Sequence, residues 1–127
     1  MFISFSWTTK PFLANAKWVT RRYWKDSHAS KFKEGMKVDA YDKLPYRSGK
    51  KIGEIAITKE PYQQNTSEMT EQDYYLEGLL WMEQNNKTIH GQKPRDFFNQ
   101  WKEKQDVVWV VEFEKTSDVK GKQMGVS

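Results

Sequence analysis

Hydrophobic and polar residues alternate along several short stretches of the chain, a pattern typical of strands with one buried face. Strands are predicted on this basis over residues 2–7, 36–42 and 50–58. The stretch 107–113 is rich in valine and apolar at almost every position, which predicts a central strand covered on both faces. A further strand is expected over residues 17–24, where threonine, valine and aromatic side chains favour a pleated backbone.

Helical segments separate these strands. Thr8 or Thr9 can cap a short helix, and Asn15 would end it in a left-handed turn. Thr-Glu-Gln-Asp at the start of residues 70–82 resembles a capping box and predicts a helix there, while Pro94 opens another helix. The order of elements predicts an α+β fold of about five or six strands with two or three flanking helices.

The size of the chain fits one domain. At 127 residues it can bury one core, which we expect in residues 1–114, and the aperiodic residues 115–127 should form a disordered tail. The absence of cysteine excludes disulfides and thiolate metal sites. Since no apolar run approaches the roughly 20 residues of a membrane span, we expect a cytoplasmic protein, with a monomer favoured.

Charge and aromatic content narrow the possible partners. Residues 1–64 carry 13 basic and 6 acidic residues, whereas residues 65–127 carry 8 basic and 11 acidic ones. Such an asymmetry favours a basic face for a polyanion, although lysines can also serve only to keep the domain in solution. Aromatic residues are 15% of the chain and include six tryptophans, enough to supply a core and stacking surfaces.

Two adjacent arginines, Arg21 and Arg22, stand out in the strand predicted over 17–24. Successive side chains of a strand point to opposite faces, so one arginine must point inward. An inward charge costs several kcal/mol, on the order expected for a buried unpaired ion, unless an anion meets it. The strand therefore lines a cleft for an anion or holds an internal ion pair, or else it is an exposed edge strand with solvated arginines.

The sequence Asn15-x-Lys17-x-x-Thr20-x-Arg22 resembles the signature of the ASCH domain family, usually Gly-x-Lys-x-x-Thr-x-Arg. Asn15 replaces the usual glycine, and asparagine also tolerates a left-handed backbone. The order of the flanking segments agrees with the family over roughly residues 3–114. The resemblance implies a PUA-like β-barrel with a cleft beside it that binds RNA.

The same resemblance implies a possible chemistry. One bacterial branch of the family hydrolyses cytidine acylated at its exocyclic amine, using a lysine and a threonine of the signature and a glutamate from a later helix. By motif position these residues would be Lys17, Thr20 and Glu77 here. Other members have been linked to RNA cleavage, which makes a ribonuclease a weaker alternative.

The residues themselves set conditions on such a site. A threonine hydroxyl needs an adjacent base, and Lys17 acts as one only if burial and the nearby arginines lower its pKa. Glu77, if close, would favour the charged lysine or handle the proton of a leaving amine, unless it is an ordinary exposed glutamate. Lys17 and Thr20 have opposite parity, so they share a cleft only if Lys17 precedes the strand or a bulge intervenes.

These observations lead to one main hypothesis. We expect RNA or a modified nucleotide to bind in a basic cleft, through Arg21, Arg22, Lys25 and the stacking residues Trp18 and Trp24. An amidohydrolase acting on acylated cytidine is the alternative, and a protein-interaction module with a purely structural polar cluster is the third. No metal and no cofactor are expected, because the two histidines are far apart and lack ligand spacing.

Overall fold

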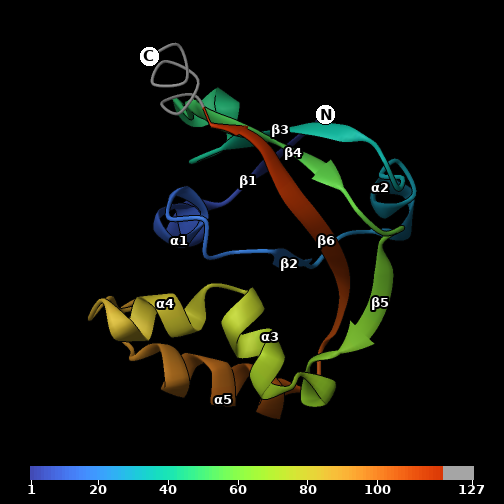
Figure 1. Cartoon of the computed structure of the whole chain (residues 1–127). Helices are drawn as coiled ribbons and strands as arrows, with labels where there is room; N and C mark the ends of the chain where they lie inside the picture. The colour runs from blue at the N-terminus through green and yellow to red at the C-terminus, as the bar shows by residue number, and fades with distance from the viewer. Residues whose placement is uncertain (119–127) are drawn as a thin grey trace.

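A strongly curled six-stranded sheet and five α-helices make up residues 1–118, the part of the chain that the computed structural model describes (Figure 1). The strands are β1 (Phe2–Ser4), β2 (Val19–Arg22), β3 (Lys37–Tyr41), β4 (Lys51–Ile57), β5 (Tyr62–Asn65) and β6 (Val107–Asp118). The helices are α1 (Thr9–Leu13), α2 (Asp26–Ala29), α3 (Glu71–Leu76), α4 (Leu79–Gln84) and α5 (Pro94–Lys104). The predicted α+β class is confirmed.

The long strand β6 holds the sheet together. The strand order is β1-β3-β4-β6-β2, and β5 also pairs with β6. The C-terminal half of β6 pairs with β4, and its N-terminal half lies between β2 and β5. Only the β1–β3 pair is parallel among the described strands. Because β1 and β2 are the two ends of this path and do not pair with each other, the sheet forms a half-barrel that is open between them (Figure 1).

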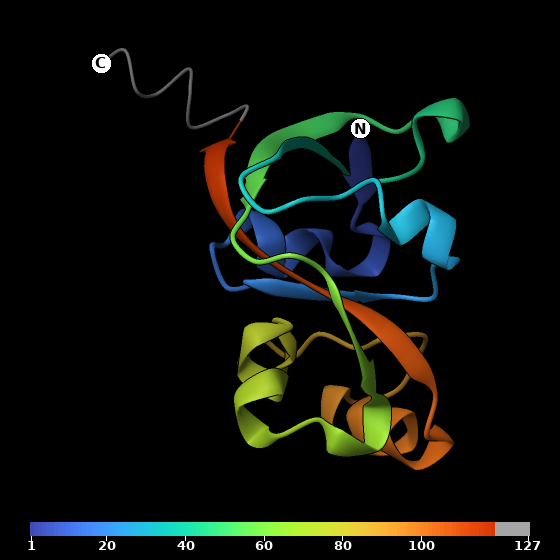
Figure 2. The same ribbon diagram turned by 90° about the vertical axis from the view of Figure 1, so that its right-hand side faces the viewer.

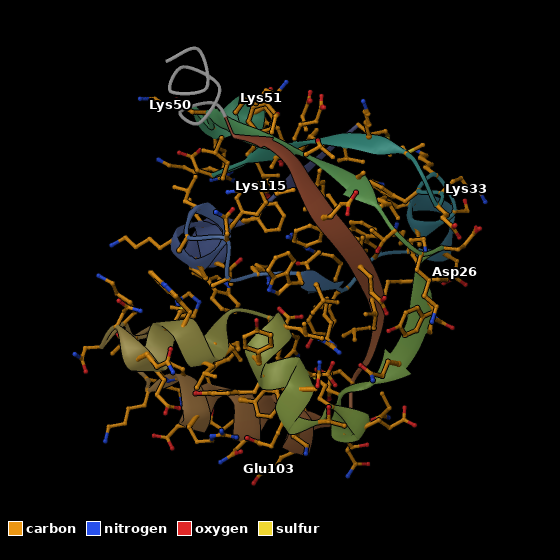
Figure 3. The ribbon with its side chains drawn as sticks, viewed as in Figure 1. Asp26, Lys33, Lys50, Lys51, Glu103 and Lys115 are labelled. Atoms are coloured by element: carbon orange, nitrogen blue, oxygen red, sulfur yellow. The ribbon has the colours of Figure 1, made fainter. Side chains whose placement is uncertain are left out.

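Two hydrophobic cores lie on either side of β2. One fills the curled sheet, whose inside is occupied by side chains (Figure 3), and includes Phe5, Phe12, Phe32, Ile55 and Phe113. The other joins the helices α3, α4 and α5 and includes Met69, Tyr74, Leu79, Phe98 and Trp101. Both views show β2 running between the sheet and these three helices (Figures 1 and 2). This position brings the side chains of β2 close to both parts of the molecule.

Valine and phenylalanine side chains of β6 confirm the prediction of a central strand. Val108, Val110, Val111 and Phe113 are at most 3% exposed. The strand continues to Asp118, beyond the boundary expected at residue 114, so residues 115–118 belong to the sheet and not to a disordered tail. Residues 119–127 of the expected tail lie outside the described residues.

The helix predicted over residues 70–82 is divided in two at Gly78. This glycine has φ +93°, which ends α3 and starts α4. A Cβ built on Gly78 would lie 2.7 Å from Cβ of Pro11, so only glycine fits where the bend meets α1. Glu77 therefore lies at the C-terminal cap of α3 and not inside a continuous helix, which corrects the prediction.

The start of β2 also differs from the prediction. The strand begins at Val19, two residues after the expected start, and Lys17 precedes it. Asn15 has φ 59°, which confirms the expected left-handed turn after α1. Lys17 is thus free of the side-chain alternation that would have pointed it away from Thr20.

Candidate functional site

A cavity of about 830 Å³ lies at the opening of the half-barrel. The end of β1 and the turn after it, Ser4–Thr8, form one wall, and Thr20, Arg21 and Arg22 of β2 form another together with Tyr23, which directly follows the strand. Residues from two loops and from one side of α5 complete the lining. These residues are Lys43, Leu44, Arg47, His90, Gln92, Phe97, Gln100, Trp101 and Lys104, with Lys17 and Glu77 at the base of β2.

A chain of buried ion pairs lies next to this cavity. Nζ of Lys17 lies 2.7 Å from Oε1 of Glu77, and it also donates to the Glu77 main-chain oxygen over 3.0 Å. Arg21 contacts Oε2 of Glu77 at 2.9 Å through Nη1 and Oδ1 of Asp73 at 2.8 Å through Nη2. The side chains of Lys17, Arg21 and Glu77 are at most 3% exposed. Both oxygens of the Glu77 carboxylate therefore have cationic partners.

Local structure explains why these residues meet. The amide of Trp18 donates to the carbonyl of Leu76 over 2.8 Å, which ties the segment before β2 to the last turn of α3. Glu77 lies between Leu76 and the bend at Gly78, and its side chain and main-chain oxygen both contact Lys17 in that segment. The position of Glu77 thus depends on a close backbone contact and not on a helix face.

Burial and the paired charges shift the pKa values in this network. Burial lowers the pKa of Lys17, the charges of Arg22 and Arg21 lower it further, and Glu77 opposes the shift. Burial also disfavours a charged Arg21, but Glu77 and Asp73 outweigh it and raise the pKa of Arg21. Arg21 thus forms the internal ion pair that the sequence offered as one alternative. Its carboxylate partners come from the α3 region.

Arg22 has different surroundings from its neighbour. Its Nε donates to Oγ1 of Thr20 over 3.0 Å, and its guanidinium lies 5.6 Å from the ring centroid of Phe5. Among residues 1–118 no carboxylate forms an ion pair with it. The side chain is half-buried and lines the cavity. Burial lowers the pKa of Arg22 to about 10, so it remains charged at neutral pH.

One side of α5 supplies an aromatic wall. Phe97 lies three and four residues before Gln100 and Trp101, which lie four and three residues before Lys104, and all of them line the cavity. Trp7 packs edge-on against Phe97, with ring centroids 5.0 Å apart. Sequence analysis missed this wall because the aromatic residues of α5 have the pattern of a core helix. Their periodicity shows which side is apolar but not what it faces.

The charges of the cavity lining are mostly positive. Arg22, Lys43, Arg47 and Lys104 line the cavity, and Glu77 is the one acidic residue among the lining residues within 1–118. Since Lys17 and Arg21 already pair with Glu77, the cavity has a net positive surface. Within residues 1–118, no group of three histidine, aspartate or glutamate side chains is arranged to hold a metal ion.

Three residues expected in the cleft do not line this cavity. Trp24 stacks on Phe32 with ring centroids 4.5 Å apart and packs against the sheet core. Trp18 lines a separate cavity of about 270 Å³. Lys25 is exposed at the start of α2 and is absent from the cavity lining. The structure thus brings together Lys17, Thr20, Arg21, Arg22 and Glu77, but not Trp18, Trp24 or Lys25.

Comparison with known proteins identifies a fold and no family. No family model matches this sequence, and a comparison with curated proteins gives no significant match. Protein EF3133 from Enterococcus faecalis V583, whose crystal structure carries the description family-model DUF984, is similar in structure, with a TM-score of 0.55. The two chains are 13% identical, and the similarity covers 89% of this chain and 72% of the other. At this identity the similarity shows a shared α+β fold. Within residues 1–118, moreover, no helix combines the length and apolar character needed to cross a membrane.

Proposed function

We propose that this protein binds a nucleotide, either free or within RNA, in the cavity beside its half-barrel. The observation that carries the proposal is Arg22, a half-buried cation that lines the cavity and forms no ion pair with a carboxylate of residues 1–118. Removing a cation from water without pairing it costs free energy. A bound phosphate would supply the missing charge and accept the hydrogen bonds of the guanidinium.

The remaining lining suits the other parts of a nucleotide. Trp7 and Phe97 offer aromatic surface for a base, and Lys43 and Arg47 add positive charge for phosphate. The volume of about 830 Å³ falls in the range of roughly 300–1,000 Å³ that is usual for small-ligand sites. Membership of the ASCH family and a PUA-like barrel are part of the proposal, and Lys17, Thr20 and Arg22 of the signature all line the cavity.

Equilibrium binding of nucleoside monophosphates and short single-stranded RNA tests this proposal. Arg22→Ala should weaken binding about tenfold or more, the scale of a lost charged hydrogen bond. Binding to the wild type should weaken as salt rises, with a shallower slope in the variant. Lys37→Ala is a control of equal charge change, because Lys37 is exposed on β3 outside the cavity. Binding that is independent of salt and unchanged in Arg22→Ala would overturn the proposal.

A second candidate function is hydrolysis of cytidine acylated at its exocyclic amine. The specific observation in its favour is the contact of 2.7 Å between Lys17 and Glu77 in a cavity that Thr20 also lines. Burial lowers the pKa of Lys17, which brings this amine closer to a role in proton transfer. In this reaction the Thr20 hydroxyl, or water, adds to the acyl carbon and gives its proton to Lys17. The amide C–N bond then breaks, and the leaving amine takes a proton from the Lys17–Glu77 pair. Where Thr20 is the nucleophile, water then hydrolyses the acyl-threonine ester, which releases the carboxylic acid and restores the Thr20 hydroxyl.

A further inference from the structure

Tyr23 presents a fixed aromatic ring at the edge of the cavity. It directly follows β2, lines the cavity and is 63% exposed. Its hydroxyl donates to Oδ2 of Asp106 over 2.8 Å and accepts from Nε1 of Trp101 over 2.8 Å. Both hydrogen-bonding functions of the hydroxyl are thus used, although most of the side chain faces solvent.

The two partners of Tyr23 are themselves held by one buried residue. Oγ1 of Thr66, which is fully buried, donates to the carbonyl of Trp101 over 2.7 Å and accepts from the amide of Asp106 over 3.0 Å. Trp101 is 8% exposed and belongs to the helical core. The ring of Tyr23 is therefore supported by rigid groups from α5 and from the start of β6.

A fixed, exposed ring is suited to stacking. Because the orientation of Tyr23 is already set, a planar ligand that stacks on it restricts little further side-chain freedom. Burial and the hydrogen bond to Asp106 raise the pKa of Tyr23, so the ring stays neutral at physiological pH. Gln100 and Lys104, exposed one turn apart on α5, line the same cavity and offer a polar and a cationic side chain.

We propose that the ligand is single-stranded RNA, with one nucleotide in the cavity and the base next to it along the strand stacked on Tyr23. This inference rests on the proposed nucleotide binding and narrows its ligand class. A free nucleotide fills the cavity but leaves Tyr23 uncovered. A strand that continues past the cavity covers Tyr23 and brings its backbone near Lys104. Stacking on an aromatic side chain tolerates any base, so the neighbouring position should show little sequence preference.

An abasic scan of a bound strand tests the inference on the unaltered protein. Fluorescence anisotropy would measure the affinity of the wild type for a labelled hexanucleotide and for versions with one abasic site at each position. Loss of the base in the cavity should weaken binding most. Loss of the neighbouring base should weaken it about tenfold, the order expected for stacking. If only one of the abasic positions weakens binding and the other abasic strands bind as well as the intact strand, the inference is overturned.

Variants of Tyr23 then test whether the neighbouring base stacks on this residue. In Tyr23→Leu the neighbouring abasic site should cause no further loss, because residue and base act as a pair. Tyr23→Phe keeps the ring and should keep most of the effect. If the abasic site weakened binding equally in Tyr23→Leu and in the wild type, the role of Tyr23 would be overturned. Nucleotide binding in the cavity would still stand in that case if Arg22→Ala weakened it as expected. If the wild type bound neither the hexanucleotide nor a nucleoside monophosphate, the proposed function would fail as well.

Discussion

Arg21 and Arg22 are adjacent on β2, but only Arg21 forms ion pairs with carboxylates. The guanidinium of Arg21 contacts two carboxylates at 2.8 and 2.9 Å, whereas no described carboxylate forms an ion pair with Arg22. Side-chain alternation along the strand sends one toward α3 and the other toward the cavity. Arg21 therefore forms the internal ion pair that the sequence offered as one alternative, and Arg22 is the residue to which we assign the proposed ligand contact.

This difference predicts unequal losses of stability for two neighbouring substitutions. Arg21→Gln removes the cation between Glu77 and Asp73, and breaking a buried pair in this way costs roughly 3–5 kcal/mol of unfolding free energy. Arg22→Gln removes no ion pair and should cost less than about 1 kcal/mol. Urea unfolding measures both, and each variant serves as the control for the other. Equal losses of stability would contradict the assignment.

Alanine at Gly78 should lower stability more than alanine at Gly91, a glycine with a similar backbone conformation. Gly78→Ala places a Cβ 2.7 Å from Cβ of Pro11 and also requires a side chain at φ +93°. Gly91→Ala has a similar φ of +82° but meets no atom within 4 Å. The backbone strain should cost each variant about 1 kcal/mol, and overpacking should cost Gly78→Ala a further 1–3 kcal/mol, roughly. Chemical denaturation gives the comparison, and a similar cost for both would show that the bend yields easily.

Sequence patterns predicted those parts of the fold that depend on local alternation and composition. The valine-rich β6 and the left-handed turn at Asn15 follow from their own residues. The break at Gly78 does not, because a lone glycine in an apolar helical pattern is tolerated in many helices. Glycine is needed at the bend because Pro11, a residue far away in the chain, approaches it too closely for a Cβ.

The candidate site shows the same limit. Lys17, Thr20 and Arg22 belong to the signature, and the resemblance added Glu77 by motif position. Their approach to one cavity could be expected only from the resemblance. Other features depend on contacts between distant segments, such as the stacking of Trp24 on Phe32 and the exposure of one side of α5 to the cavity. The periodicity of hydrophobic residues along the sequence does not show which partner an aromatic side chain contacts.

Tyr62 predicts a change in stability at alkaline pH. Burial, together with the hydrogen bond to Glu112 at 2.7 Å, raises the pKa of Tyr62 to about 12, whereas an unfolded tyrosine has a pKa near 10. The folded state favours the neutral phenol, so this stabilisation is complete below about pH 10 and is lost as pH rises through about 12.

The measurement compares unfolding free energies of the wild type and Tyr62→Phe from pH 8 to pH 12. The wild type should lose more stability than the variant above about pH 10. Tyr46→Phe is the control, because Tyr46 is 77% exposed on the loop between β3 and β4, and it should follow the wild type. Parallel curves for the wild type and Tyr62→Phe would contradict the raised pKa.

The amidohydrolase alternative predicts turnover of acylated cytidine that depends on the buried Lys17–Glu77 pair. Lys17→Ala and Glu77→Gln should each lower kcat by two or more orders of magnitude, the usual scale for losing acid–base assistance. Release of free cytidine, followed by chromatography, measures the rate. A pH profile adds a second readout, because Glu77→Gln removes the charge that opposes the lowered pKa of Lys17.

Loss of stability must be separated from loss of catalysis in these variants. Asp73→Asn disturbs the same ion network through Arg21, but Asp73 does not line the cavity and does not contact Lys17 or Thr20 among the described interactions. It should therefore weaken folding while retaining most of the turnover at a temperature where all variants are folded. If Asp73→Asn lost as much activity as Glu77→Gln, the carboxylate of Glu77 would act through stability alone. A wild type that left acylated cytidine intact would exclude the hydrolase, while nucleotide binding through Arg22 would still be open to its own test.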